Sequence, residues 1–181
     1  MGMRIVLMTL GDANRERLLR DPELVRSAVS RDDDDDDDEA GSVRGTIELA
    51  GHEGQILDLD KAWGAIHYLL TGTAWEGEAP QNFLLCGGEQ VGDVELGLGP
   101  ARSLSAEATR GAAALLQSVT DAALRTRFDP ADMKGKEIYP DFWDESDPNA
   151  ELDYVLQHLA ALRAFVERAA AKRMGLLIWL S

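Results

Sequence analysis

Hydrophobic residues along the chain form short runs and helical stripes that together predict an α+β fold. Residues 3–10 are rich in Ile, Val, Leu and Met and end at Gly11-Asp12, which is typical of a buried strand followed by a turn. The last apolar run, residues 176–180, predicts another strand. The simplest arrangement places these two terminal strands side by side in one mixed or antiparallel sheet, with helices packed on it.

The clearest helical pattern runs from about Asn149 to Arg173, directly after Asp147-Pro148. Its apolar positions lie alternately three and four residues apart, as a packed helix face requires. They are Leu152, Val155, Leu159, Leu162, Val166 and Ala169. We therefore expect one long helix near the C-terminus, ended by Gly175.

Shorter elements are expected between these two ends. A short helix or pair of helices is predicted across residues 14–30, and Ser105 is placed to cap a helix that reaches Val119. A further helical piece covers residues 120–127, after which Asp129-Pro130 starts a short turn and residues 136–143 form a loop. The glycine-rich stretch 74–102 indicates turns with one or two strands, around its apolar pieces 83–86 and 94–98.

The block from Gln55 to Gly72 carries most of the candidate chemistry. It predicts a helix whose start Asp58 or Asp60 can cap and whose end Gly72 can close in a left-handed conformation. Four residues at helical spacing share one face of this helix: Trp63, Ile66, His67 and Leu70.

Length and composition indicate one ordinary globular domain over residues 1–181, with 45% hydrophobic residues. It is expected to be a monomer or a small homo-oligomer. The single cysteine, Cys86, rules out an intrachain disulfide and a thiolate metal cluster. No apolar run reaches the roughly 18 residues of a membrane span, and no signal peptide is recognisable. We therefore expect a cytoplasmic protein that does not bind membranes.

The net charge of −15 arises from 33 acidic and 18 basic residues. The run from Asp32 to Glu39 supplies eight of the acids, and without it the charge is −7. We interpret residues 31–45 as a flexible acidic surface loop, with a low-affinity calcium or polycation site as the alternative. An acidic surface repels phosphate backbones, so no direct nucleic-acid binding is expected and a basic protein is the better-matched partner.

His67 is the best candidate for catalysis, because Asp58 and Asp60 are near it in sequence and an imidazole titrates near neutral pH. With Tyr139 these residues suggest a small hydrolase or a metal-assisted enzyme. The alternatives are that His67 packs beside Trp63 with one ring nitrogen hydrogen-bonded, and that the aspartates cap a helix. Further ligand-binding candidates are Trp63, Tyr68, Thr71 and Arg102. The sequence contains no motif for a catalytic nucleophile, a metal site or a cofactor site. We therefore expect no metal and no cofactor to be bound.

Five blocks of the sequence resemble the YfbM-like family, a domain of unknown function in small bacterial proteins. They are Leu57-Asp58-Leu59-Asp60-Lys61-Ala62-Trp63, Ile66-His67-Tyr68-Leu69-Leu70-Thr71-Gly72, Gly99-Pro100-Ala101-Arg102, Arg127-Phe128-Asp129-Pro130 and Ile138-Tyr139-Pro140. The resemblance implies a compact α+β fold and a bacterial source, and it implies no activity and no catalytic residues.

Two functions remain open at this point. The first is a non-enzymatic binding protein that engages a basic partner through its acidic surface, in the manner of an inhibitor or immunity protein. The alternative is the enzyme centred on His67 with Asp58 and Asp60.

Overall fold

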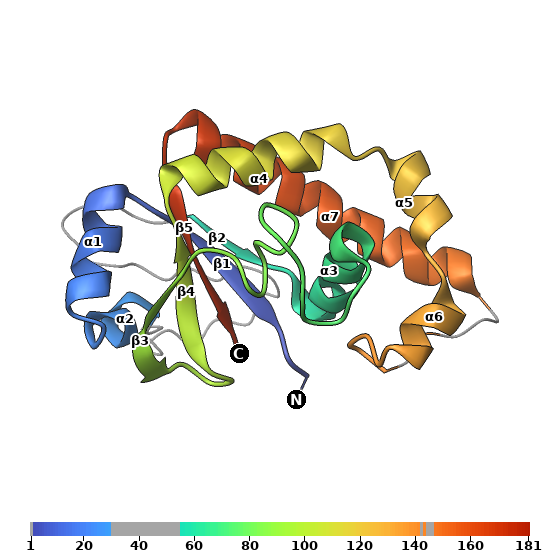
Figure 1. Ribbon diagram of the computed structural model, residues 1–181, viewed down its shortest axis with the longest axis horizontal. Coiled ribbons are helices and arrows are strands. Elements are labelled where there is room, and N and C mark those ends of the chain that lie inside the picture. The colour runs from blue at the N-terminus through green and yellow to red at the C-terminus, as the bar shows by residue number, and fades with distance from the viewer. Residues whose placement is uncertain (1, 30–54, 142, 144–146) are drawn as a thin grey trace, which may run out of the picture.

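The computed structural model of the chain describes residues 2–29, 55–141, 143 and 147–181. Its centre is a five-stranded sheet of order β2-β1-β5-β4-β3, antiparallel at every pairing (Figure 1). The strands are β1 (Ile5–Leu10), β2 (Ile56–Asp58), β3 (Glu89–Glu95), β4 (Pro100–Leu104) and β5 (Gly175–Leu180). This confirms the α+β fold and the adjacency of the terminal strands. The expected acidic loop, residues 31–45, lies wholly outside the described residues.

Helices cover the two faces of the sheet unequally (Figure 1). On one face, the main core joins the sheet to α3 (Trp63–Thr71), α4 (Ala106–Ser118) and α7 (Pro148–Ala171). On the other face, a smaller cluster joins it to α1 (Asp12–Arg20) and α2 (Leu24–Val29). The remaining helical pieces are the 3₁₀ turn η1 (Asp60–Ala62), α5 (Asp121–Arg127) and α6 (Pro130–Gly135).

Strand β1 is apolar at almost every position because both of its faces are buried. Ile5 and Leu7 belong to the main core, whereas Met8 and Leu10 belong to the smaller cluster. Side chains alternate between the two faces of a strand, so a continuous apolar run is what a strand covered on both sides requires. The same alternation on β5 sends Leu177 and Trp179 to the second face.

Side-chain caps begin four of the helices, as the local sequence indicates. Each cap accepts a hydrogen bond from a backbone N–H in the first turn, which would otherwise lack a partner. The pairs are Ser105 with Ala108, Thr120 with Ala123, Asp129 with Asp132 and Asp147 with Ala150. The Ser105 cap is the one expected for α4, while the Asp129 cap shows that Asp129-Pro130 opens a helical turn, α6, and not only a bend.

Two boundaries differ from the sequence-based expectation. The apolar piece 83–86 is a turn, and the two strands of this region are β3 and β4. Phe83 and Leu84 are buried in the main core without pairing, so their hydrophobicity reflects burial and not strand structure. At the end of α7, Arg173 adopts the left-handed conformation with φ of 55°, and Gly175 is already the first residue of β5.

Arg163 on α7 ties this helix to the segment that joins α4 and α5. Its guanidinium donates to the carbonyl oxygens of Leu116 at 3.1 Å and Val119 at 2.6 Å. It also forms an ion pair with Asp121 at the start of α5. A planar, forked donor satisfies all three acceptors at once, including carbonyls at the end of α4 that have no partner within that helix.

Replacing Arg163 with Lys is expected to lower the free energy of unfolding by about 1–3 kcal/mol, because a single ammonium cannot reach three acceptors. Urea titration followed by circular dichroism measures this loss. The control is Arg168→Lys at an exposed position of α7, which should change stability by less than about 0.5 kcal/mol. Equal effects of the two substitutions would contradict the role assigned to Arg163.

Candidate functional site

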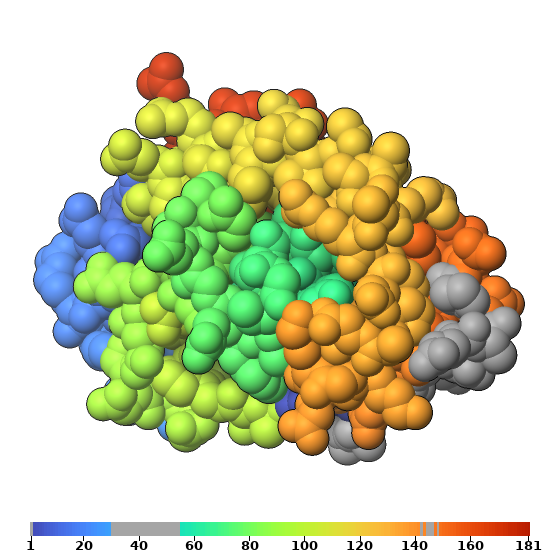
Figure 2. Space-filling view, turned by 45° about the vertical axis from the view of Figure 1, so that its right-hand side comes forward, coloured from blue at the N-terminus to red at the C-terminus, as the bar shows by residue number. Residues whose placement is uncertain are grey.

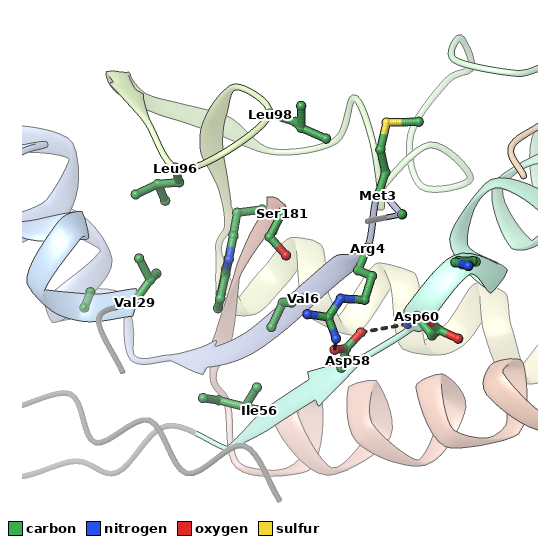
Figure 3. A pocket seen from close by; sticks show the side chains of 14 residues that line it. Met3, Arg4, Val6, Val29, Ile56, Asp58, Asp60, Leu96, Leu98 and Ser181 are labelled. Carbon is green, nitrogen blue, oxygen red and sulfur yellow. Dashed lines mark hydrogen bonds and ion pairs between the residues drawn. The ribbon is translucent and has the colours of Figure 1, made fainter. Parts of the chain in front are cut away.

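A cavity of about 850 Å³ lies on the second face of the sheet (Figure 3). Its floor consists of alternate residues of three neighbouring strands, and the strand register aligns them in rows. Val6 of β1 is paired with Asp58 of β2 on one side and with Trp179 of β5 on the other. Because their side chains point to the same face, they form a continuous surface across the sheet.

Apolar side chains form most of the cavity wall. Ala28 and Val29 contribute from the end of α2, and Leu96 and Leu98 from the turn between β3 and β4. Leu98 is 52% exposed and is one of the exposed large hydrophobic residues in the described part of the chain. The partly buried residues at the margin of the smaller cluster, such as Ile56 and Trp179, also line the cavity. The cavity is therefore the part of the second face that α1 and α2 leave uncovered.

Charged residues gather at the end of the cavity where β2 leads into η1. Arg4, which directly precedes β1, donates to the Asp58 carboxylate at 3.0 Å, and Figure 3 shows its guanidinium beside that carboxylate. The other oxygen of Asp58 accepts from the backbone N–H of Asp60 at 2.7 Å. The Asp58 carboxylate therefore accepts from the first residue of η1 and not from the start of α3. Arg4 and the Asp60 amide together hold this side chain in place.

Asp60 has a different role from the cap expected for it. Its backbone is in the left-handed region with φ of 47°, and its side chain caps neither η1 nor α3. One carboxylate oxygen accepts instead from the Tyr154 hydroxyl of α7 at 2.9 Å. Burial, the hydrogen bond to Asp60 and the charge of that carboxylate raise the pKa of Tyr154 to about 12. Tyr154 therefore remains a neutral donor that holds Asp60 at the cavity.

His67 is fully buried on α3 and is not among the residues that line the cavity. Its Nε2 lies 3.0 Å from the carbonyl oxygen of Glu76, and its Nδ1 is buried without a hydrogen-bond partner in the described structure. Burial lowers the pKa of His67, and the bond to Glu76 opposes this only in part. In Figure 2, α3 (teal) lies between the segment that follows it, in green, and the yellow-to-orange region of α5 and α6.

The structure places Tyr139 against Trp63 of α3. The two rings stack with centroids 5.0 Å apart, and the Trp63 indole N–H donates to the carbonyl oxygen of Met3 at 3.0 Å. The backbone carbonyl of Tyr139 lies directly against Gly64, so a side chain at that position would collide with it. These contacts attach the 136–143 loop to α3 and leave Tyr139 outside the cavity lining.

Tyr68 and Thr71 also serve to connect parts of the fold. The Tyr68 hydroxyl donates to Asp132 of α6 at 2.6 Å, and Lys136 reaches the same carboxylate oxygen at 2.6 Å. Burial, then this hydrogen bond, raise the pKa of Tyr68 well above its usual value. The Thr71 hydroxyl donates to the carbonyl of His67 within α3. Both side chains are thus engaged by neighbouring protein groups.

Arg102 of β4 holds the glycine turn before β3. Its guanidinium donates to the carbonyl oxygens of Gly87 at 2.8 Å and Gly88 at 2.9 Å. Gly88 has φ of 72°, a conformation in which glycine is unstrained. The pairing explains the glycines of this region as turn residues.

Of the sequence-based candidates, the cavity contains Asp58 and Asp60, while His67, Tyr139, Trp63, Tyr68, Thr71 and Arg102 are placed elsewhere. Sequence reasoning did not identify Arg4, Tyr154, Trp179 or Leu98 as site residues. Of these four residues, only Trp179 could have been recognised from the sequence, because an aromatic residue near the end of a terminal strand is expected to be partly exposed. Within the described ranges, no group of three His, Cys, Asp or Glu side chains is placed to hold a metal ion.

The fold and the cavity define an α+β protein in which, within the described part of the chain, one face of the sheet carries a cavity. The chain belongs to the family described as Domain of unknown function (DUF1877), whose model matches residues 1–179. It is also similar to the solved structure of YfbM, a protein of unknown function from Escherichia coli. The TM-score is 0.72 at 17% sequence identity, over 98% of this chain and 99% of that one. At this identity the likeness shows the fold alone, and no curated protein matches the sequence.

The described part of the chain contains no helix that is both long and apolar enough to cross a membrane.

The burial of His67 predicts a loss of stability in mild acid. Because the folded-state pKa of His67 lies below its unfolded value of 6.5, the unfolded chain binds the proton first as pH falls. The stability that the neutral His67 contributes is fully present above pH 6.5 and is lost as pH falls through the folded pKa. Over this range the free energy of unfolding falls by up to about 1.4 kcal/mol per pH unit. Urea titrations of wild type and His67→Gln from about pH 7.5 to 5 compare the slopes. A slope as steep in His67→Gln as in wild type would contradict this assignment.

Proposed function

We propose that this protein is a non-enzymatic binding protein and that the cavity on the second face of the sheet is its binding surface. The observation that carries the proposal is the cavity itself, about 850 Å³ with a mainly apolar wall and charged groups at one end only. Concave, mostly apolar sites with a few placed polar groups are typical of binding sites. The rigid sheet beneath it supports a preformed site.

A basic protein is the partner that the charge of the chain favours. The net charge of −15 accelerates the approach of positively charged molecules and repels negatively charged ones. On the described surface, however, several carboxylates are already paired, as in Arg15–Glu89 at 2.8 Å and Arg125–Asp153 at 3.1 Å. Charge therefore supports attraction of the partner, while the cavity supplies the contact surface.

The positions of the candidate catalytic groups support binding over catalysis. A catalytic histidine must contact the substrate, yet His67 is buried and does not line the cavity that holds Asp58 and Asp60. Asp58 is also committed to Arg4 and to the Asp60 amide. The arrangement therefore does not bring a base, a nucleophile and a substrate pocket together.

The proposal is tested by selecting peptides from a random display library on the immobilised protein and measuring their affinities for two variants. Leu98→Ser removes an exposed apolar side chain from the cavity and should weaken binding about tenfold, as expected for the burial of half a leucine side chain. Trp75→Ser removes a side chain that is equally exposed but outside the cavity lining, and it should leave affinity unchanged.

Salt dependence separates the contribution of charge from that of the cavity. Affinity for the selected peptides should fall several-fold between about 50 and 200 mM salt in wild type and in both variants. If no peptide is enriched, or if Trp75→Ser weakens binding more than Leu98→Ser does, the cavity is not the binding surface.

A further inference from the structure

We infer that Asp60 is the anchor of the binding site, and that it pairs with a lysine or arginine side chain of the partner whose apolar neighbours lie on the cavity floor. This inference rests on the proposed binding function and specifies the chemistry of the segment that is bound. In this orientation, the cationic group of the partner lies near η1, and the apolar residues of the partner lie near Val6 and Trp179.

The first step concerns which carboxylate in the cavity is available. Asp58 is neutralised by Arg4, and its two oxygens are occupied by the guanidinium and by the Asp60 amide. The Asp60 carboxylate, by contrast, has no cationic partner within 4.0 Å among the residues that the structure describes. Its only described side-chain partner is the Tyr154 hydroxyl, which is neutral. Asp60 therefore presents an unpaired negative charge at the cavity.

The second step concerns Lys61, which follows Asp60 in the sequence. Lys61 also lines the cavity, and its side chain lies against the N-terminal segment, where a Cβ atom added at Gly2 would lie only 2.5 Å from the Lys61 Cε. It does not form an ion pair with Asp60 in the described structure. A cation supplied by a partner can therefore reach Asp60 without displacing an ion pair.

The third step concerns the shape of the ligand. Lysine and arginine side chains have an apolar stem and a charged end, so they match a site in which an apolar wall leads to a carboxylate. The Tyr154 bond holds that carboxylate in position, which reduces the entropy lost when the ion pair forms. A basic residue followed by apolar residues is thus the segment that the cavity suits, and the net charge of −15 favours its approach.

The test uses two synthetic peptides, acetyl-Lys-Leu-Leu-amide and its norleucine analogue, which has the same stem without the ammonium group. Binding is followed by the NMR resonance of the Trp179 indole, assigned with a Trp179→Phe variant. Wild type should bind the lysine peptide about tenfold more tightly, as expected for one charge-assisted hydrogen bond. In Asp60→Asn the two peptides should bind equally.

Asp60→Asn suits this test because asparagine tolerates the left-handed backbone and still accepts a hydrogen bond from Tyr154. Its thermal midpoint should stay within about 2 °C of wild type, which shows that the fold is kept. Glu107→Gln, on α4, removes the same charge from an exposed position and should retain the preference for lysine.

The outcomes separate this inference from the proposed function. If Asp60→Asn keeps the lysine preference while Leu98→Ser weakens both peptides, the cavity binds but Asp60 is not its anchor. If Glu107→Gln loses the preference as Asp60→Asn does, the effect comes from overall charge and the inference is overturned. If neither peptide shifts the Trp179 resonance in wild type, the inference and the proposed binding surface both fall.

Discussion

The antiparallel pairing of β1 with β5 is the interaction on which the rest of this structure depends. All six residues of β1 are paired with β5, from Ile5 opposite Leu180 to Leu10 opposite Gly175. Beyond the strand, Arg4 and Ser181 exchange two backbone hydrogen bonds of 2.8 Å. Strand β2 pairs with β1 and strand β4 pairs with β5, and β3 joins the sheet through β4. Joining segments so distant in sequence has a high entropic cost, which continuous burial on both faces offsets.

Alternation along these central strands decides what each face of the sheet can do. Residues directed to the first face, such as Ile5 and Leu7, pack in the main core with residues of α3, α4 and α7. Among the described helices, those on the second face are α1 and α2, and the row of Asp58, Val6 and Trp179 lies at a cavity beside them. A rigid floor with an uncovered face is the arrangement that allows binding without a large change in shape.

The block from Leu57 to Gly72 has a divided role in the structure. Its first part, with Asp58 and Asp60, forms the charged end of the cavity. Its second part, helix α3, is buried along almost its whole length and supports the surrounding loops through His67 and Tyr68. A histidine and a tyrosine beside acidic residues resemble a catalytic group in sequence, but here their side chains bond to neighbouring segments, His67 to the Glu76 carbonyl and Tyr68 to Asp132. One continuous motif thus combines a surface role with a structural one.

The sequence by itself determined the elements whose signals are local. The apolar spacing of α7, the Ser105 cap, the left-handed Gly72 and the two terminal strands can all be predicted, because they depend on residues within a few positions of one another. The phosphate, nucleophile and metal motifs that it lacks are local signals as well.

Only the tertiary structure decided which candidate side chains reach solvent and which support the fold. Tyr154 and Asp60 are 94 residues apart, Arg4 and Asp58 are 54 apart, and Arg102 meets a turn 14 or 15 residues away. No periodicity or spacing encodes such pairs, since they depend on how the helices pack on the sheet. The cavity itself was invisible for the same reason: it exists because α1 and α2 cover only part of one face, which is a property of the packed elements and not of any residue in them.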